Sequence, residues 1–247
     1  MPLKYAYVLP IIEGLWFPVT FAITYTIGVL KKDIPAVFPY VSDTGAWSIE
    51  KCIFSFMLGL GSLLMFSIIY IRYRQVKELL STKEKELNLP PKLKIFNVIA
   101  VYLGLIAALG VFVVACFQVW PHFYVHIIGA GTAFTVGWFV LVIETYISFK
   151  IYPTFGSSGM NTVRAVLTVI SGLALFLTGA FGGLSLLYFK GEDVTQWFED
   201  SGGYEYHLVS TVSEWVLVLG VVFYIASYYK EFKDIVMYKP KIDLINV

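Results

Sequence analysis

Charge is scarce in this sequence of 247 residues. Only 14% of the residues are charged and 58% are hydrophobic, whereas soluble domains contain about 25% charged and about 45–50% apolar residues. Such a chain cannot cover a water-facing surface, which excludes a soluble globular enzyme, a disordered protein and a nucleic-acid-binding protein. The chain has only two cysteines, so a disulfide framework is excluded as well. We therefore expect no nucleic acid among its partners.

The sequence does contain six long apolar stretches. A helix needs about 20 apolar residues to cross the core of a bilayer. Backbone polar groups in lipid must pair within their own segment, so each stretch predicts a helix. Together they predict an all-α, polytopic membrane protein in which residues 1–247 form a single six-helix transmembrane domain. The predicted helices are residues 6–30, 52–71, 95–120, 125–149, 165–189 and 207–229.

The basic residues predict the orientation of the chain. If both termini are cytosolic, 14 of the 18 Lys and Arg residues lie on the cytosolic side. Cytosolic loops of membrane proteins carry such an excess, so we expect both termini in the cytosol. The charged segment 72–94 should continue the second helix into the cytosol until Pro90 and Pro91 stop it. Its basic residues would attract anionic lipid or a cytosolic protein partner.

Three glutamates lie inside the apolar stretches, where ionisable groups are functional candidates by default. Glu13 and Glu144 lie toward the cytosolic ends of their helices, where we expect their carboxylates to reach water. Glu214 lies near the outer end of the last helix. His207 and Ser210 precede it by seven and four residues, so these three side chains share one helical face.

A polar cluster on the outer side is the main candidate site. His126 begins the fourth helix from that side, and Asp43 lies in the first outer loop. Asp43, His126 and His207 would ligate a divalent metal, with Glu214 as a base. Alternatively, His126, His207, Ser210 and Glu214 would line a pocket for a small molecule or lipid head group, or simply bond the helices together. No short metal motif joins these residues, so we expect no cofactor, with a divalent metal as the weaker alternative.

Small residues predict close helix contacts. Gly129, Ala133 and Gly137 are spaced by four, and so are Gly179 and Gly183, which is typical of helices that pack against a neighbour in a membrane.

The two cysteines, Cys52 and Cys116, lie near the outer ends of their helices. A disulfide between them is possible in an oxidising lumen. Free thiols are the more usual case, so we favour two free cysteines.

Several segments resemble one membrane-protein family. Residues 39–45 (Pro-Tyr-Val-Ser-Asp-Thr-Gly), followed by 49–54, resemble the first outer loop and second helix of the damage-regulated autophagy modulators. These proteins, called DRAM proteins, belong to the wider Frag/DRAM/Sfk family. Residues 117–118, 126–130, 206–210 and 214–215 agree with it in the same order. The resemblance covers nearly the whole chain.

The resemblance implies a six-helix protein of lysosomal or related endomembranes that promotes autophagy. Other family members act at the plasma membrane with phosphoinositide kinases, or in the Golgi on the lipid of GPI anchors. We therefore favour a non-enzymatic regulator of autophagy or of lysosomal membrane state, acting through lipid or protein contacts. The alternatives are an intramembrane lipid hydrolase or acyltransferase using the outer polar cluster, and a phosphoinositide-kinase scaffold at the plasma membrane.

Overall fold

Residues 4–87 and 90–238 are described by the computed structural model, with the side chains of 83–87 left aside. Within these residues, six helical spans are long and apolar enough to cross a membrane, and no strand forms. The prediction of an all-α, polytopic membrane protein is confirmed. The helices are α1 (Val8–Lys31), α2 (Ser48–Leu87), α3 (Lys92–Cys116), α4 (Phe123–Gly131), α5 (Gly137–Ile151), α6 (Ser158–Tyr188), α7 (Tyr204–Ala226) and α8 (Tyr229–Phe232).

The ends of the helices follow from local sequence signals. Lys32 adopts a left-handed conformation and its N–H bonds to carbonyls of the last turn of α1, which ends that helix. The Ser157 hydroxyl accepts a hydrogen bond from the Met160 N–H at the start of α6. Gly202 has a φ of 76°, and a Cβ there would lie 2.3 Å from the Tyr188 carbonyl oxygen. Only glycine fits this turn between α6 and α7.

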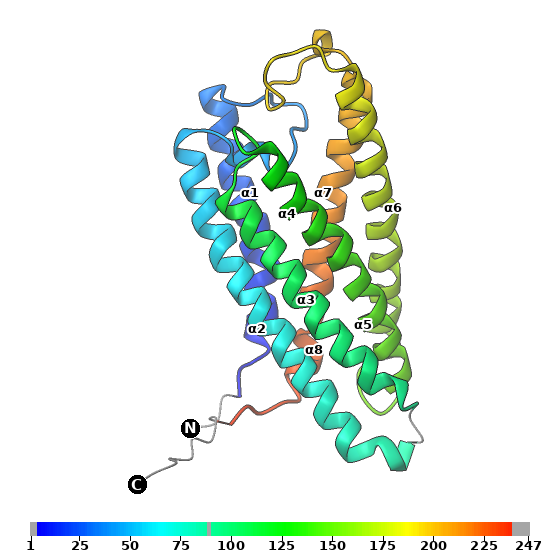
Figure 1. Ribbon diagram of the computed structural model, residues 1–247. Coiled ribbons are helices and arrows are strands. Elements are labelled where there is room, and N and C mark those ends of the chain that lie inside the picture. The colour runs from blue at the N-terminus through cyan, green and yellow to red at the C-terminus, as the bar shows by residue number, and fades with distance from the viewer. Residues whose placement is uncertain (1–3, 88–89, 239–247) are drawn as a thin grey trace, which may run out of the picture.

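The fourth span is interrupted in the middle. A short π-helix, Thr132–Val136, joins α4 to α5, and the three segments run as one bent rod (Figure 1). Single π turns inside α-helices are frequent at functional sites. Here the π turn carries Phe134 and Thr135 to the wall of a cleft.

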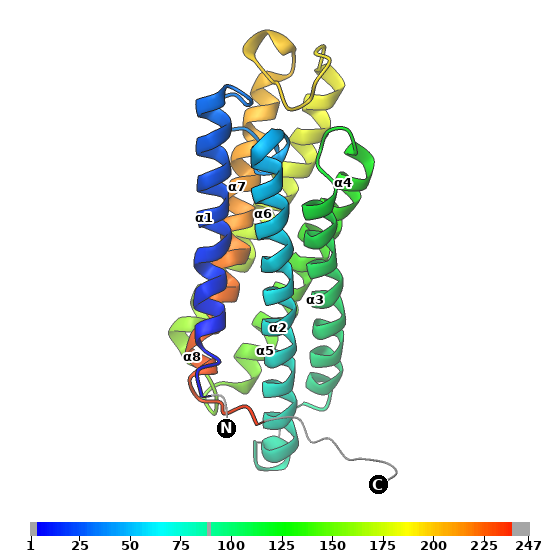
Figure 2. The same ribbon diagram turned by 90° about the vertical axis from the view of Figure 1, so that its left-hand side faces the viewer.

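The bundle has two distinct ends (Figures 1 and 2). Both ends of the described chain lie at one of them, which we call the terminal end. The loops 32–47, 117–122 and 189–203 lie at the other, which we call the loop end. Helices α6 and α7 run side by side over most of their length and extend beyond the other helices at the loop end.

Small residues mediate part of the helix packing. A Cβ on Gly129 would lie 2.8 Å from a methyl group of Val113 in α3, and Gly137 faces Ala107 of α3. Ala133 packs against Gly110 of α3. A Cβ on Gly110 would lie 2.6 Å from the backbone nitrogen of Ala133.

The expected contact at Gly179 and Gly183 is not present. A Cβ at either position would meet nothing within 4 Å. It is Gly182, one residue away from Gly183, that packs against Ser210 of α7. The glycines spaced by four therefore face away from the contact, on the side of α6 turned toward α4.

Candidate functional site

The first loop returns into the bundle at the loop end, where α7 holds it. The Val41 N–H donates to the Glu214 carboxylate at 2.7 Å. The Tyr40 hydroxyl donates to Ser210 at 2.7 Å, and the indole N–H of Trp215 donates to the Pro39 carbonyl at 2.9 Å. Glu214 and Ser210, which the sequence places on one helical face, therefore both act as anchors for this loop.

The returning loop carries Asp43 into the protein interior. Asp43 is 2% exposed and lies in a 3-10 turn, Asp43–Gly45. One carboxylate oxygen, Oδ2, accepts the Tyr40 N–H at 3.1 Å, while the buried Oδ1 has no hydrogen-bond partner. Buried polar atoms are nearly always paired, so this oxygen is an acceptor that lacks a donor.

Burial raises the pKa of the Asp43 carboxyl well above its ordinary range, because a charged carboxylate is poorly solvated there. The nearby carboxylates of Glu214 and Asp193 raise this pKa further, and the Tyr40 N–H opposes them. The site therefore disfavours a negative charge on Asp43 unless a positive partner is supplied.

A cleft of about 400 Å³ opens beside Asp43. Its walls come from α4, the π turn, α6, α7 and the first loop, and include Asp43, His126, Ser210 and Glu214. The exposed rim contains Ile127 and Gly131 from one side and Gly179 and Gly183 from the other. Because the rim lies on membrane-spanning helices, the cleft opens sideways toward lipid.

A second, apolar pocket of about 90 Å³ continues from the cleft toward the middle of the bundle. The two share Ser42, His126, Ala130, Phe134 and Glu214 as walls. The rest of the inner pocket is formed mainly by aliphatic and aromatic side chains, including Phe17, Phe54, Leu58, Met65 and Val218. A polar region therefore borders directly on an apolar one.

The two predicted histidines occupy different positions. His126 is buried, and its Nδ1 lies 2.7 Å from the Phe117 carbonyl oxygen. A carbonyl only accepts, so Nδ1 donates, and Nε2 of the neutral ring is left as an acceptor. His207 lies behind the cleft wall, stacked on Trp197 at 4.3 Å between ring centroids and edge-on to Tyr40 at 5.0 Å. His126 lines the cleft, whereas His207 supports the aromatic residues that do.

The metal hypothesis requires three ligands that converge on one point. Among the described residues, no group of three or more His, Cys, Asp and Glu side chains has the arrangement of a metal site. Asp43 and His126 line the cleft, but His207 is separated from it by its ring contacts.

The side chains of Cys52 and Cys116 are exposed, and neither forms a disulfide.

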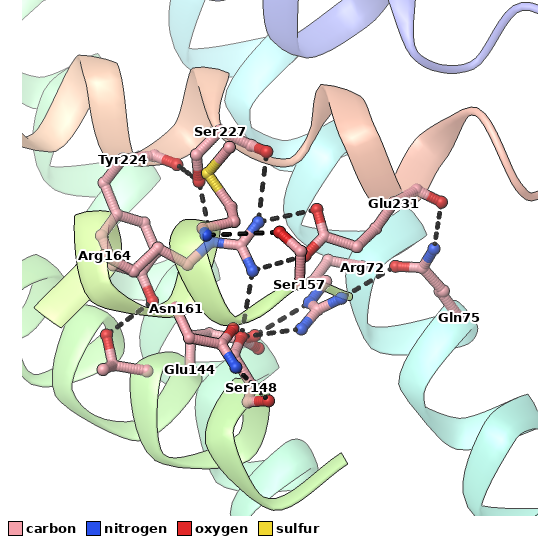
Figure 3. A network of polar contacts seen from close by, with 12 residues as sticks. Arg72, Gln75, Glu144, Ser148, Ser157, Asn161, Arg164, Tyr224, Ser227 and Glu231 are labelled. Atoms are coloured by element: carbon pink, nitrogen blue, oxygen red, sulfur yellow. Dashed lines mark hydrogen bonds and ion pairs between the residues drawn. The ribbon is translucent and has the colours of Figure 1, made fainter. Parts of the chain in front are cut away.

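Sequence reasoning missed a buried charged network at the terminal end (Figure 3). Arg72 donates from Nε to Glu144 at 3.0 Å. Arg164 forms a bidentate pair with Glu231, at 2.6 and 2.8 Å. Both arginines donate to the Ser148 hydroxyl, at 3.3 and 3.1 Å. The network joins α2, α5, α6 and α8.

This network corrects two predictions. The count of basic residues places Arg72 and Arg164 in cytosolic segments, and the sequence predicts that Glu144 reaches water. These three side chains are only 1%, 0% and 4% exposed. A signal existed in α6, where Asn161, Arg164 and Thr168 share one helical face.

Glu13 also does not reach water. Its side chain is 0% exposed, and neither carboxylate oxygen has a partner. Its position near one end of the apolar stretch suggested access to water. The sequence does not show that neighbouring helices cover this position.

Comparison with known proteins places these features in a family. The profile of the Frag1/DRAM/Sfk1/Cwh43P N-terminal domain matches residues 5–235. The chain is 32% identical over 234 residues to "DNA damage-regulated autophagy modulator protein 2" of Mus musculus, covering 93% of this chain and 84% of the relative. It is 28% identical over 228 residues to "DNA damage-regulated autophagy modulator protein 1" of Homo sapiens, covering 92% and 91%.

A more distant relative is "Transmembrane protein 150A" of Xenopus laevis, 25% identical over 197 residues, covering 80% of this chain and 62% of the relative. No solved structure matches the chain. The resemblance to the DRAM proteins is confirmed. The chain belongs to the Frag1/DRAM/Sfk1/Cwh43P N-terminal domain family.

Proposed function

We propose that this protein is a non-enzymatic membrane regulator of autophagy that acts by holding a lipid in the cleft between α4 and α6. The observation that carries this proposal is the sideways cleft, in which Asp43 and Glu214 border an apolar pocket. A ligand from the bilayer would place its head group beside the carboxyl groups and an apolar part in the inner pocket. Ligand sites commonly combine an apolar lining with a few convergent polar groups.

The role in autophagy rests on the relatives, which are called DNA damage-regulated autophagy modulators. Fold alone does not fix function. The proposed lipid binding is therefore argued from the cleft, and the proposed role in autophagy from the names of the relatives. We place the protein in lysosomal or endolysosomal membranes, with the loop end facing the lumen.

A protein contact is proposed on the opposite face. Helix α2 continues to Leu87, and Arg74 and Lys77 on it are exposed. We propose that this basic segment docks an acidic cytosolic partner. Arg72 is buried and takes no part, and the side chains of Lys83 and Lys85 lie outside the described residues.

The lipid-binding proposal is tested by a substitution that fills the cleft at a glycine with open space around it. Gly183→Leu fills the rim of the cleft, because a side chain there meets no neighbour. Gly159→Leu is the matched control, on the same helix and equally open but away from the cleft. In cells that lack the protein, we expect the wild type and Gly159→Leu to restore turnover of an autophagosome marker.

Gly183→Leu should restore less than half of that turnover at equal expression, and should co-purify with less lipid. Full rescue by Gly183→Leu, with no change in bound lipid, would contradict the proposal.

A further inference from the structure

We propose that the cleft selects a lipid whose head group is a protonated amine and that lacks a phosphate. This inference rests on the lipid-binding role proposed above and specifies the ligand of the same site. Its basis is the charge and hydrogen-bonding capacity of the walls beside Asp43.

The formal charges at the cleft are of one sign. Asp43 and Glu214 line it, and no Lys or Arg is among the described residues of either the cleft or the inner pocket. A cationic head group would give the two buried carboxyl groups the positive partner that they lack. Such charge-assisted hydrogen bonds are about twice as strong as neutral ones.

The free acceptors of the site match the donors of an ammonium group. Oδ1 of Asp43 is buried and unpaired. Oε2 of Glu214 already accepts the Val41 N–H, but a carboxylate oxygen has capacity for a second hydrogen bond. Nε2 of His126 is a third acceptor in the neutral ring. An ammonium group has three donors and no acceptor, so it can donate to these acceptors and brings no acceptor of its own that would stay unpaired.

Aromatic rings add to the preference of the site for a cation. Tyr40, Phe123, Phe134 and Trp197 are all wall residues. The negative faces of such rings attract cations, including ammonium groups, and the best-known use of this interaction is the binding of quaternary ammonium ligands in aromatic cages.

A phosphate head group fits poorly for the same reasons. It would bring negative charge next to Asp43 and Glu214, with no cation in the described lining to neutralise it. The pKa of Asp43 is already raised by burial and by nearby carboxylates, so a further anion would be strongly disfavoured. A neutral alcohol would bind more weakly, because it forms no charge-assisted hydrogen bond with Asp43 or Glu214.

The test compares three ligands with the same alkyl chain: octadecylamine, octadecanol and octadecyl phosphate. Binding of each is measured on the purified full chain in nonionic detergent micelles. We expect saturable binding of octadecylamine, binding of octadecanol about tenfold weaker, as expected from the loss of one charge-assisted interaction, and no saturable binding of octadecyl phosphate.

Two isosteric variants separate charge from shape. Asp43→Asn keeps an acceptor for the Tyr40 N–H but removes the ionisable group. It should weaken octadecylamine binding about tenfold more than it changes octadecanol binding, and a thermal-unfolding midpoint close to that of the wild type checks that the variant is folded. Glu214→Gln is the second variant, with the same expected pattern.

The outcomes distinguish the two proposals. If Gly183→Leu abolishes octadecanol binding but the amine binds no better than the alcohol, the lipid cleft stands and the amine selectivity is wrong. Unchanged amine affinity in both Asp43→Asn and Glu214→Gln also overturns the selectivity. If Gly183→Leu binds all three ligands as the wild type does, the lipid cleft itself is wrong and both proposals fail.

Discussion

The guanidinium carbons of Arg72 and Arg164 lie 5.0 and 4.8 Å from the centre of the Tyr228 ring. Both side chains are also paired with carboxylates and with Ser148. Arginine suits such a site because it stays charged and its planar fork satisfies several acceptors at once. A buried pair of charges contributes little net stability, but removing one partner leaves the other charge uncompensated.

This asymmetry gives a prediction at the residue scale. Glu144→Gln keeps the shape of the side chain and removes the negative charge that faces Arg72. We expect it to lower the free energy of unfolding by about 3–5 kcal/mol. Unfolding by sodium dodecyl sulfate in mixed micelles measures this change.

The matched control is Glu78→Gln, because Glu78 is an exposed carboxylate on α2. It should change the free energy of unfolding by less than about 0.5 kcal/mol. Equal stability of the two variants would show that Arg72 is compensated by its other partners, Gln75 and Ser148.

Single residues were predictable where the apolar background isolates them. Glu214 and Ser210 stand out because a helical face in an apolar stretch contains few polar groups, and both lie at the cleft. Asp43 lies in a loop, and nothing in its local sequence shows that the loop returns into the bundle. Arg72 and Arg164 could not be placed inside, because residues at the end of an apolar stretch also fit a cytosolic loop.

At the scale of elements, α3 approaches the backbone of α4 and of the π turn closely at Gly110. A Cβ on Gly110 would lie 2.6 Å from the backbone nitrogen of Ala133 and 2.8 Å from the carbonyl oxygen of Gly129. Backbone atoms cannot move aside as a flexible side chain can, so a substitution there must push α3 and α4 apart.

Gly110→Ala should therefore lower the free energy of unfolding by about 1–3 kcal/mol, the usual cost of overpacking. Gly131→Ala is the control, because a Cβ there meets nothing within 4 Å and alanine favours a helix more than glycine by about 1 kcal/mol. It should be neutral or stabilising in the same unfolding titration. A stable Gly110→Ala variant would mean that α3 and α4 are not held together as closely as described.

The helices themselves were predictable because lipid leaves few alternatives for a long apolar segment. Which face of a helix contacts which neighbour was not. Gly129 and Gly179 belong to similar patterns of small residues, yet one packs against α3 and the other lines the cleft. The π turn after α4 also has no clear sequence signal, because the residues Thr132–Val136 are compatible with an ordinary helix.

At the scale of the whole molecule, the two ends of the bundle are built differently. The terminal end is closed by the charged network of Arg72, Glu144, Arg164 and Glu231. The loop end is opened by the cleft between α4 and α6. The orientation of the protein therefore decides which leaflet supplies the proposed ligand.

Burial of two arginines changes the basis of the predicted orientation without reversing it. With Arg72 and Arg164 inside the bundle, 12 of the remaining 16 basic residues still belong to segments that the sequence predicts to be cytosolic. The excess of Lys and Arg near the ends of the helices is what places a segment in the cytosol. We therefore expect a tag after Val247 to be labelled by antibody when only the plasma membrane is permeabilised.

A tag inserted after Gly191, in the loop between α6 and α7, should be labelled only when the organelle membrane is opened as well. The reverse pattern would place the termini in the lumen and contradict the charge argument. It would also move the cleft to the cytosolic leaflet.

In the predicted orientation, the cleft draws its ligand from the luminal leaflet. The basic segment of α2, with exposed Arg74 and Lys77, then faces cytosolic partners.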